Sequence, residues 1–460
     1  MLHSRFIHAT PLLGCIASLA VGPALAEGRQ PSVELILSRP EGIAARAGIA
    51  LTESQRTMLE LAKDSTATVG VKVMAAPTAA RLERTLTKDA SHPTAARIAL
   101  ALSDETVLTA VRTSVEKRPD MGVWHGTIEE TGAPVLLMWW PNGHMAGSVE
   151  HQGRFYSIRP MGGSMHAIVE MSEARMPPDH ALPMLVASNE QLGLSRRANA
   201  LTQATDDSRR LRSLLQAEIA ARKPRPGSPI AERFRGAAPA GDVAIDVLVA
   251  YTKKAASHYD DIERDLVHLA IEDANSSFGR SNLSHVKLRL VHAYQADYAE
   301  AGGHFDHVWR LADKGDGYLE EIHGLRDKYR ADVVVLIVDD AQGCGLSTRV
   351  HADAEEAFAV VHHECATTTH TLAHEIGHII GARHDLHIDS IMTPFPYGHG
   401  YINGTKWRDI MSYKESCGGC PRVAVWSSPT VLVDGEPAGT PQHNNARVIA
   451  EQAMRVAAFR

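Results

Sequence analysis

Residues 374–385 read His-Glu-Ile-Gly-His-Ile-Ile-Gly-Ala-Arg-His-Asp, and this stretch decides how the second half of the chain folds. Positions four apart on a helix share one face, so His374 and His378 can direct ring nitrogens toward the same point. Glu375 lies beside them and can reach a water at that point. The stretch therefore predicts a buried helix with a metal-binding face.

His384 joins this site only if the helix ends before it. A continuing helix would carry His384 about 15 Å along the axis from His374. Gly381 resolves this, because glycine is the usual residue for the left-handed turn that ends a helix. Three histidines around an open fourth position are the arrangement of a catalytic zinc site. We expect His374, His378 and His384 to hold one zinc ion as neutral imidazoles, with Glu375 as the general base.

Histidine is concentrated in this region, since nine of the 25 histidines fall between His351 and His399. We expect the helix to begin at about Thr369, with residues 367–369 offering caps. The remaining histidines near the motif are expected to be surface or structural residues, not a second metal site: His362, His363, His370 and His399.

The long form of the motif, extended by Gly381 and His384, is similar to the signature of the metzincin zinc peptidases. Residues 407–413, Trp-Arg-Asp-Ile-Met-Ser-Tyr, resemble the methionine turn of those enzymes. Asp385 resembles the adamalysin-like branch, whereas Tyr413 is similar to the tyrosine that approaches the metal in astacins and serralysins. With Tyr-Gly-His-Gly-Tyr at 397–401, the mixture most resembles the bacterial peptidyl-Asp metalloendopeptidases.

This resemblance implies an α/β (α+β) catalytic domain with a mixed five-stranded sheet, an edge strand along the cleft and an active-site helix. Met411 would be an apolar floor beneath the metal. Tyr413 would either donate a hydrogen bond to the reacting oxygen or pack in the core. Asp385 would hold the turn after His384. An acidic substrate side chain next to the cut would need a basic residue, and the sequence offers five: Arg383, Lys406, Arg408, Lys414 and Arg422.

The order of predicted elements agrees with an α/β layer in the second half. We expect strands at 243–251, 286–291, 333–338 and 358–362, and helices at 260–278 and 318–329. The first half opens with helical pieces, and a β-meander is predicted from the strand signals at 135–140, 145–150 and 155–158. No catalytic constellation is expected in the first half.

Three regions divide the chain. Residues 1–26 read as a removable signal peptide, with Arg5, an apolar run and Ala-Leu-Ala at 24–26. Residues 27–240 form a β-rich, propeptide-like domain that ends in an exposed Pro-, Gly- and Arg-rich linker at about 221–241. Residues 241–460 are expected to be the catalytic domain. The chain is therefore expected to be secreted or periplasmic, with no further segment apolar enough to cross a membrane.

Cysteine usage agrees with export. Removal of the signal peptide leaves four cysteines, and an even number in an exported chain favours two disulfides. Three pairings are possible, of which we favour Cys344 with Cys365 and Cys417 with Cys420.

The sequence thus predicts a secreted zinc metalloendopeptidase that acts on protein or peptide substrates. A net charge of −7 argues against a nucleic-acid partner. The propeptide is expected to act as an intramolecular inhibitor through a carboxylate or simple bulk, because no cysteine lies between Glu27 and Gly343 to serve as a cysteine switch. Two alternatives remain open: a catalytically silent, zinc-stabilised binding protein, and a periplasmic zinc amidase acting on cell-wall peptides.

Overall fold

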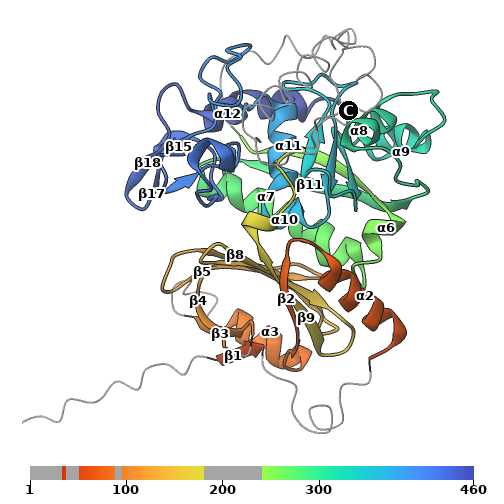
Figure 1. Ribbon diagram of the computed structural model, residues 1–460, viewed down its shortest axis with the longest axis vertical. Helices are drawn as coiled ribbons and strands as arrows, with labels where there is room; N and C mark the ends of the chain where they lie inside the picture. The colour runs from red at the N-terminus through yellow and green to blue at the C-terminus, as the bar shows by residue number, and fades with distance from the viewer. Residues whose placement is uncertain (1–33, 38–50, 89–95, 104, 181–240) are drawn as a thin grey trace, which may run out of the picture. The chain divides into compact units, whose positions relative to one another are not determined.

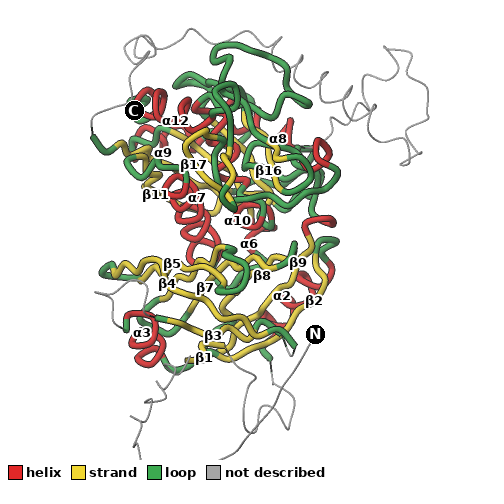
Figure 2. The backbone as a smooth tube through the Cα atoms, turned by 90° about the vertical axis from the view of Figure 1, so that its left-hand side faces the viewer, coloured by secondary structure: helices red, strands yellow, loops and turns green. Residues whose placement is uncertain are grey.

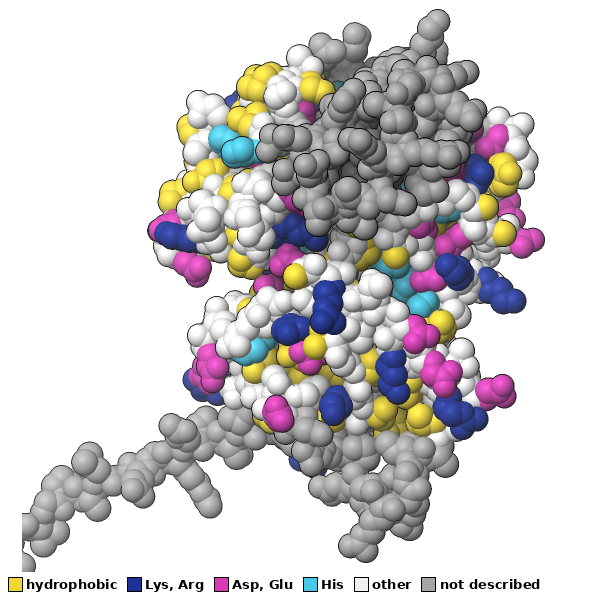
Figure 3. All heavy atoms as spheres, in the orientation of Figure 1, with side chains coloured by type: hydrophobic (Ala, Val, Ile, Leu, Met, Phe, Trp, Pro, Cys, Tyr) yellow, Lys and Arg dark blue, Asp and Glu magenta, His cyan; other side chains and the backbone are white. Residues whose placement is uncertain are grey.

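The computed structural model describes residues 34–37, 51–88, 96–103, 105–180 and 241–460. The predicted signal peptide at 1–26 and residues 221–240 of the predicted linker lie outside these ranges. No helix in the described part of the chain has the length and apolarity needed to cross a membrane. Basic and acidic side chains are interspersed over the described surface that Figure 3 draws.

The first half is built on a nine-stranded sheet, drawn as the lower yellow layer in Figure 2. From β3 to β9 the strands follow one another as an antiparallel meander, while β1 pairs in parallel with β3 and β2 pairs with β9 at the opposite edge. In sheet order the strands are β1 (Glu34–Leu37), β3 (Arg97–Ala101), β4 (Val107–Lys117), β5 (Gly122–Ile128), β6 (Pro134–Trp139), β7 (Met145–His151), β8 (Arg154–Pro160), β9 (Met165–Ser172) and β2 (Thr68–Ala75).

Two helices pack against this sheet. Helix α2 (Glu53–Asp64) begins at a capping box in which the side chains of Thr52 and Gln55 exchange hydrogen bonds with each other's backbone N–H. Leu82 and Leu86 of α3 (Ala79–Thr87) are buried in the same core as Trp139. After β9 a short 3-10 turn, η1 (Glu173–Arg175), leads toward His180.

The second half contains a mixed five-stranded sheet. In sheet order the strands are β11 (Val286–Ala296), β10 (Val243–Thr252), β12 (Val333–Val338), β14 (Phe358–His362) and β13 (Gly345–Ser347). Neighbouring strands are parallel except at β13, which pairs antiparallel with β14 and forms one edge. The coarse α/β class predicted from the sequence is confirmed.

Helices cover both faces of this sheet (Figure 1). Val333, Val335 and Ile337 of β12 share a core with one set of helices, and the intervening Val334, Leu336 and Val338 share a core with the other. Burial on both faces explains the continuous apolar run of β12. The first set is α7 (His268–Arg280), which follows the π-turn η2 (Glu263–Val267), with α11 (Thr371–Ile380) and α12 (Asn445–Val456); the second is α8 (His304–Ala312) and α9 (Glu321–Tyr329).

Helix α11 begins slightly later than expected. Its N-cap is His370 in a left-handed conformation with no side-chain capping bond, so the prediction that residues 367–369 cap the helix is wrong. The Thr369 hydroxyl instead bonds to the Cys365 carbonyl of the short helix α10 (Cys365–Thr368) and to the Thr371 hydroxyl.

The chain after α11 is mostly irregular. It contains two small ribbons and a 3-10 turn: β15 (Ile402–Asn403) with β16 (Trp407–Arg408), β17 (Ser428–Val433) with β18 (Glu436–Ala438), and η3 (Lys414–Cys417). The one remaining short helix described here, α6 (Lys253–Ala256), follows β10. The structure joins Cys344 to Cys365 and Cys417 to Cys420, which is the favoured pairing.

Trp426 ties this irregular part to the helices. Its ring stacks on Phe278 at 5.6 Å, its Nε1–H donates to the Ser277 hydroxyl at 3.0 Å, and it is fully buried.

We predict that Trp426→Ala lowers the free energy of unfolding by about 3–5 kcal/mol, because a large cavity opens and a buried hydroxyl loses its donor. Denaturant unfolding measures this loss. Leu432→Ala, at a side chain that is 63% exposed, is the control and should change stability by less than about 0.5 kcal/mol.

Candidate metal centre

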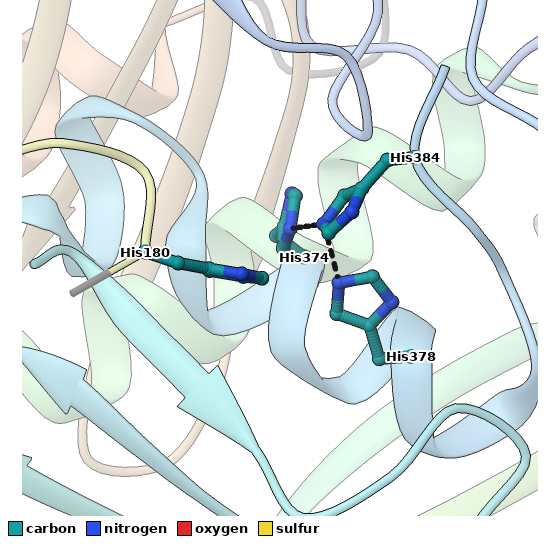
Figure 4. Close-up of side chains that lie close together, drawn as sticks. All are labelled: His180, His374, His378 and His384. Atoms are coloured by element: carbon teal, nitrogen blue, oxygen red, sulfur yellow. Dashed lines mark hydrogen bonds between the residues drawn. The ribbon is translucent and has the colours of Figure 1, made fainter. Parts of the chain in front are cut away.

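The three histidines of the motif meet at one buried point (Figure 4). His374 and His378 project from the same face of α11, one turn apart. The Nε2 atom of His384 lies 3.2 Å from Nε2 of His374 and 2.8 Å from Nε2 of His378. The structure therefore brings together the three side chains expected to act as ligands.

Gly381 makes this convergence possible. It ends α11 with φ at +136°, a conformation that L side chains rarely adopt. The chain then turns back, and the His384 backbone is fixed from outside, because His399 Nδ1–H donates to the His384 carbonyl at 3.0 Å. His399 is fully buried, which removes the surface alternative, and its hydrogen bond to the His384 carbonyl supports a structural role.

Hydrogen bonds assign the tautomers of the two helical histidines. Nδ1 of His374 faces the Ile410 carbonyl and Nδ1 of His378 faces the Ala382 carbonyl, both at 2.9 Å. A carbonyl only accepts, so each Nδ1 carries the proton and each Nε2 presents a lone pair. Burial lowers the pKa of His374 well below its ordinary value and that of His378 to about 4, which keeps both rings neutral.

These nitrogens fit a divalent cation. A single proton on His384 Nε2 cannot satisfy two facing lone pairs, whereas one cation can accept all three. Nitrogen ligands about 2.0–2.1 Å from a tetrahedral zinc lie about 3.3 Å from one another, close to the separations observed here. The donor set and its spacing are thus those of a zinc-type site.

Glu375 lies beside this point and is fully buried. Neither of its carboxylate oxygens makes a hydrogen bond within the described residues, although His180 Nε2 lies 3.3 Å from Oε1. Strand β13 passes close above it: a Cβ at Gly345 would lie only 2.6 Å from Glu375 Oε1. A buried carboxylate held without a donor is available to accept a proton from a water.

The methionine turn lies beneath the helix. Met411 is fully buried, and a Cβ at Gly377 would lie 3.4 Å from its sulfur. The Tyr413 ring is buried 4.5 Å from the His384 ring. Asp385 accepts the Tyr413 backbone N–H at 3.1 Å, so it links the turn after His384 to this segment.

A fourth histidine, His180, reaches the same point from the first half of the chain (Figure 4). Its Nε2 lies 3.3 Å from Glu375 Oε1, and its ring centroid is 4.9 Å from that of His384. Sequence reasoning missed this residue and expected no functional constellation in the first half. The local signal was slight: residues 177–180 read Pro-Pro-Asp-His, an extended polar segment after the last strand of the meander.

The other histidines of the cluster are not surface residues. His362, His363 and His370 are all buried, which removes the surface alternative. His370 Nδ1 lies 2.7 Å from an Asp273 carboxylate oxygen, and His363 lies within ligand distance of His258 and Asp339. His363 is already hydrogen-bonded to Tyr259 and Asp339, which supports a structural role.

Comparisons with known proteins agree with this geometry. A model of the Reprolysin_5 group, described as metallo-peptidase family M12, matches residues 242–427. The peptidyl-Asp metalloendopeptidase of Stenotrophomonas maltophilia is 31% identical over 416 residues, covering 85% of this chain and 89% of that protein. That of Xanthomonas campestris pv. campestris is 33% identical over 318 residues, covering 69% and 67%. That of Pseudomonas fragi is 38% identical over 124 residues, covering 26% and 78%.

The first two alignments cover 85% and 69% of this chain, so each extends over parts of both halves. Residues 242–427 therefore resemble the M12 metallopeptidases, and the chain belongs with the peptidyl-Asp metalloendopeptidases and is a metalloendopeptidase that acts on proteins or peptides.

Proposed function

We propose that this metalloendopeptidase is a secreted zinc enzyme, made as a latent precursor, that hydrolyses internal peptide bonds with Glu375 as the general base. The names of its relatives further suggest that it cuts beside aspartate. One observation carries the proposal: three histidine nitrogens with converging lone pairs lie next to a buried carboxylate that has no donor among the described residues.

His374, His378 and His384 would hold the zinc ion. When bound, zinc would lower the pKa of a bound water to about 7 and would stabilise the negative charge that develops on the peptide carbonyl oxygen. Glu375 accepts the proton of the attacking water and passes it to the leaving amine. Met411 supplies an apolar floor, and Tyr413 is near enough to His384 to donate to the reacting oxygen after a small side-chain movement.

The two alternatives are less well supported. A silent binding protein needs the three histidines but has no use for a buried carboxylate without a donor, which is destabilising. A cell-wall amidase shares the metal, but the relatives over most of the chain are named as endopeptidases.

Export is supported by two features. The sequence at 1–26 has the pattern of a signal peptide, and disulfides persist in compartments outside the cytosol. We therefore propose a secreted or periplasmic location.

Latency would come from His180. Its ring lies against Glu375 and the three histidines, where a water and a substrate carbonyl must be placed. An intramolecular blocking group acts at a high effective concentration until the chain is cut. Cleavage in the exposed linker predicted at about 221–241 would let residues 27–240 dissociate and open the site.

We predict that Glu375→Gln keeps about one zinc per chain but lowers casein hydrolysis by about 10²-fold or more, because the general base is lost. His378→Ala should lose both the metal and the activity. Elemental analysis and a casein assay on the same samples measure the two effects. Full activity of the Glu375 variant would contradict the mechanism.

Matched controls are available for both variants. His387 follows in the same loop with a side chain that is 73% exposed, so His387→Ala should retain zinc and activity. Glu320→Gln replaces an exposed carboxylate that precedes α9 and should behave like the wild-type chain.

We also predict that His180→Ala makes the full-length chain at least about 10-fold more active on a short peptide substrate than the wild-type full-length chain, because removal of the ring lets a water reach Glu375. Electrophoresis of the assayed sample shows whether the segment at 173–180 is cut during the assay. His144→Ala, in the turn between β6 and β7, serves as the control. Equal latency of the wild-type and His180 variants would exclude this role for His180.

A further inference from the structure

The segment that carries His180 lies along the edge strand of the catalytic sheet. The Cys344 N–H donates to the Pro178 carbonyl at 2.8 Å, and the Gly345 N–H donates to the Asp179 carbonyl at 3.3 Å. His180 itself forms a parallel bridge with Gly345 of β13. The segment therefore lies along β13 through two backbone hydrogen bonds and one isolated bridge, a limited form of the strand addition in which the backbone gives affinity and side-chain pockets give specificity.

Adjacent side chains of this segment enter different sites. His180 faces the three histidines, whereas Asp179 is buried against Arg422, with Asp179 Oδ1 2.7 Å from Arg422 Nη2. Only one peptide unit separates the two positions. The Arg422 site thus lies next to the point where Glu375 would activate water.

Arg422 is held rigidly for this contact. Its side chain is 2% exposed, Nη1 donates to the Thr369 carbonyl at 2.7 Å, and Nη2 also donates to the Ser412 carbonyl at 3.1 Å. Both carbonyls are neutral and belong to the segments that flank the metal site. Asp179 is the one carboxylate in the described chain recorded as an ion pair with Arg422.

The positive charge of Arg422 is paired with Asp179, which belongs to the segment that would leave when the precursor is cleaved. Burial alone would raise the pKa of Asp179, but Arg422, followed by Arg408 and Lys414, holds that pKa below its ordinary value. If residues 173–180 leave the site when the precursor is cleaved, the buried guanidinium loses its hydrogen-bonded carboxylate, and of the acids that raise its pKa Asp409 stays in the catalytic half. Such a group strongly favours the binding of another carboxylate.

The remaining basic candidates differ from Arg422. Arg408 is also buried and also pairs with an acid of the departing segment, Glu173, but Glu173 lies seven residues before His180. Arg383 is paired with Asp389 at 2.8 Å, the side chain of Lys406 is 61% exposed, and Lys414 is only partly buried. Only Arg422, among the five candidates considered, combines burial with a contact one residue from His180.

We propose that Arg422 is the residue that binds an acidic substrate side chain next to the scissile bond, and that Asp179 occupies this subsite in the precursor. The inference rests on the proposed function and deepens it. Because a neutral side chain would leave the guanidinium unpaired, the subsite should discriminate between aspartate and asparagine by about 10- to 100-fold.

The test compares peptides that differ only by Asp, Asn or Leu at one position, cleaved by the processed enzyme obtained from the full-length chain. The wild-type enzyme should favour Asp over Asn by about 10- to 100-fold in kcat/KM. Arg422→Gln should bring this ratio to within about 3-fold of unity, whereas Arg422→Lys should retain part of it. The control Arg447→Gln, at an exposed side chain on α12, should keep the wild-type ratio.

A second measurement keeps the inference testable if Arg422→Gln does not fold. A synthetic peptide of residues 174–180 should inhibit the wild-type enzyme at least about 10-fold more strongly than the same peptide with Asp179→Asn. If the two peptides inhibit equally, or if an active Arg422 variant keeps its preference for Asp, the proposed role of Arg422 is wrong while the proposed peptidase function still stands. Absence of any chelator-sensitive cleavage by the wild-type enzyme overturns the proposed function, and this inference with it.

Discussion

The convergence of three imidazole nitrogens on one buried point constrains the rest of the catalytic half. A proton on His384 Nε2 can satisfy only one of the contacts at 2.8 and 3.2 Å, so without a cation one facing lone pair stays unsatisfied. Metal binding and folding are therefore linked, as they are wherever ligands must be brought together before the ion is present. Gly381 and Gly345 serve the same geometry: the first turns the chain back, and the second leaves space for the Glu375 carboxylate under the edge strand.

The helical ligands and His384 are positioned by different means. Regular hydrogen bonding of α11 fixes His374 and His378, whereas His384 lies in a segment with little secondary structure. Hydrogen bonds from buried polar side chains hold this segment in place of the backbone hydrogen bonds of a helix or sheet. His399 donates to the His384 carbonyl, and Asn445 bonds both the N–H and the carbonyl of Arg383. Leaving any of these buried groups unpaired costs about 1–3 kcal/mol, so the position of His384 depends on a complete network.

The sequence predicts what depends on local pattern. Strands β10, β12 and β14 are apolar runs that match their predicted ranges closely, and the motif at 374–385 identified the residues that meet at the metal centre. Strands β2 and β4 escaped detection because exposed positions such as Lys72 in β2 and Thr113 and Lys117 in β4 interrupt the apolar pattern. The N-cap at His370 was missed because its left-handed conformation has no sequence signal at histidine.

Contacts between distant parts of the chain were beyond local pattern. Five basic residues near the motif were indistinguishable by type and spacing, and what separates Arg422 from the others is its burial against Asp179, 243 residues away. His180 was overlooked for the same reason, since nothing in its neighbours indicates a metal site. Asp179 and His180 are adjacent in one extended segment. The first contacts the Arg422 guanidinium and the second contacts the three histidines, so the Arg422 site and the candidate metal centre lie next to each other.

An acidic residue in a substrate pocket would, by itself, make residues 173–180 a substrate. The neighbouring histidine prevents this on physical grounds. With Nε2 3.3 Å from Glu375 Oε1, the His180 ring fills the space that a water must occupy to be deprotonated by Glu375. In the proposed precursor, recognition through Asp179 and blockage through His180 would require each other: the first would hold the segment in place, and the second would keep its backbone from being cut. His180 thus offers a chain with no cysteine between Glu27 and Gly343 another side chain that can block the proposed site.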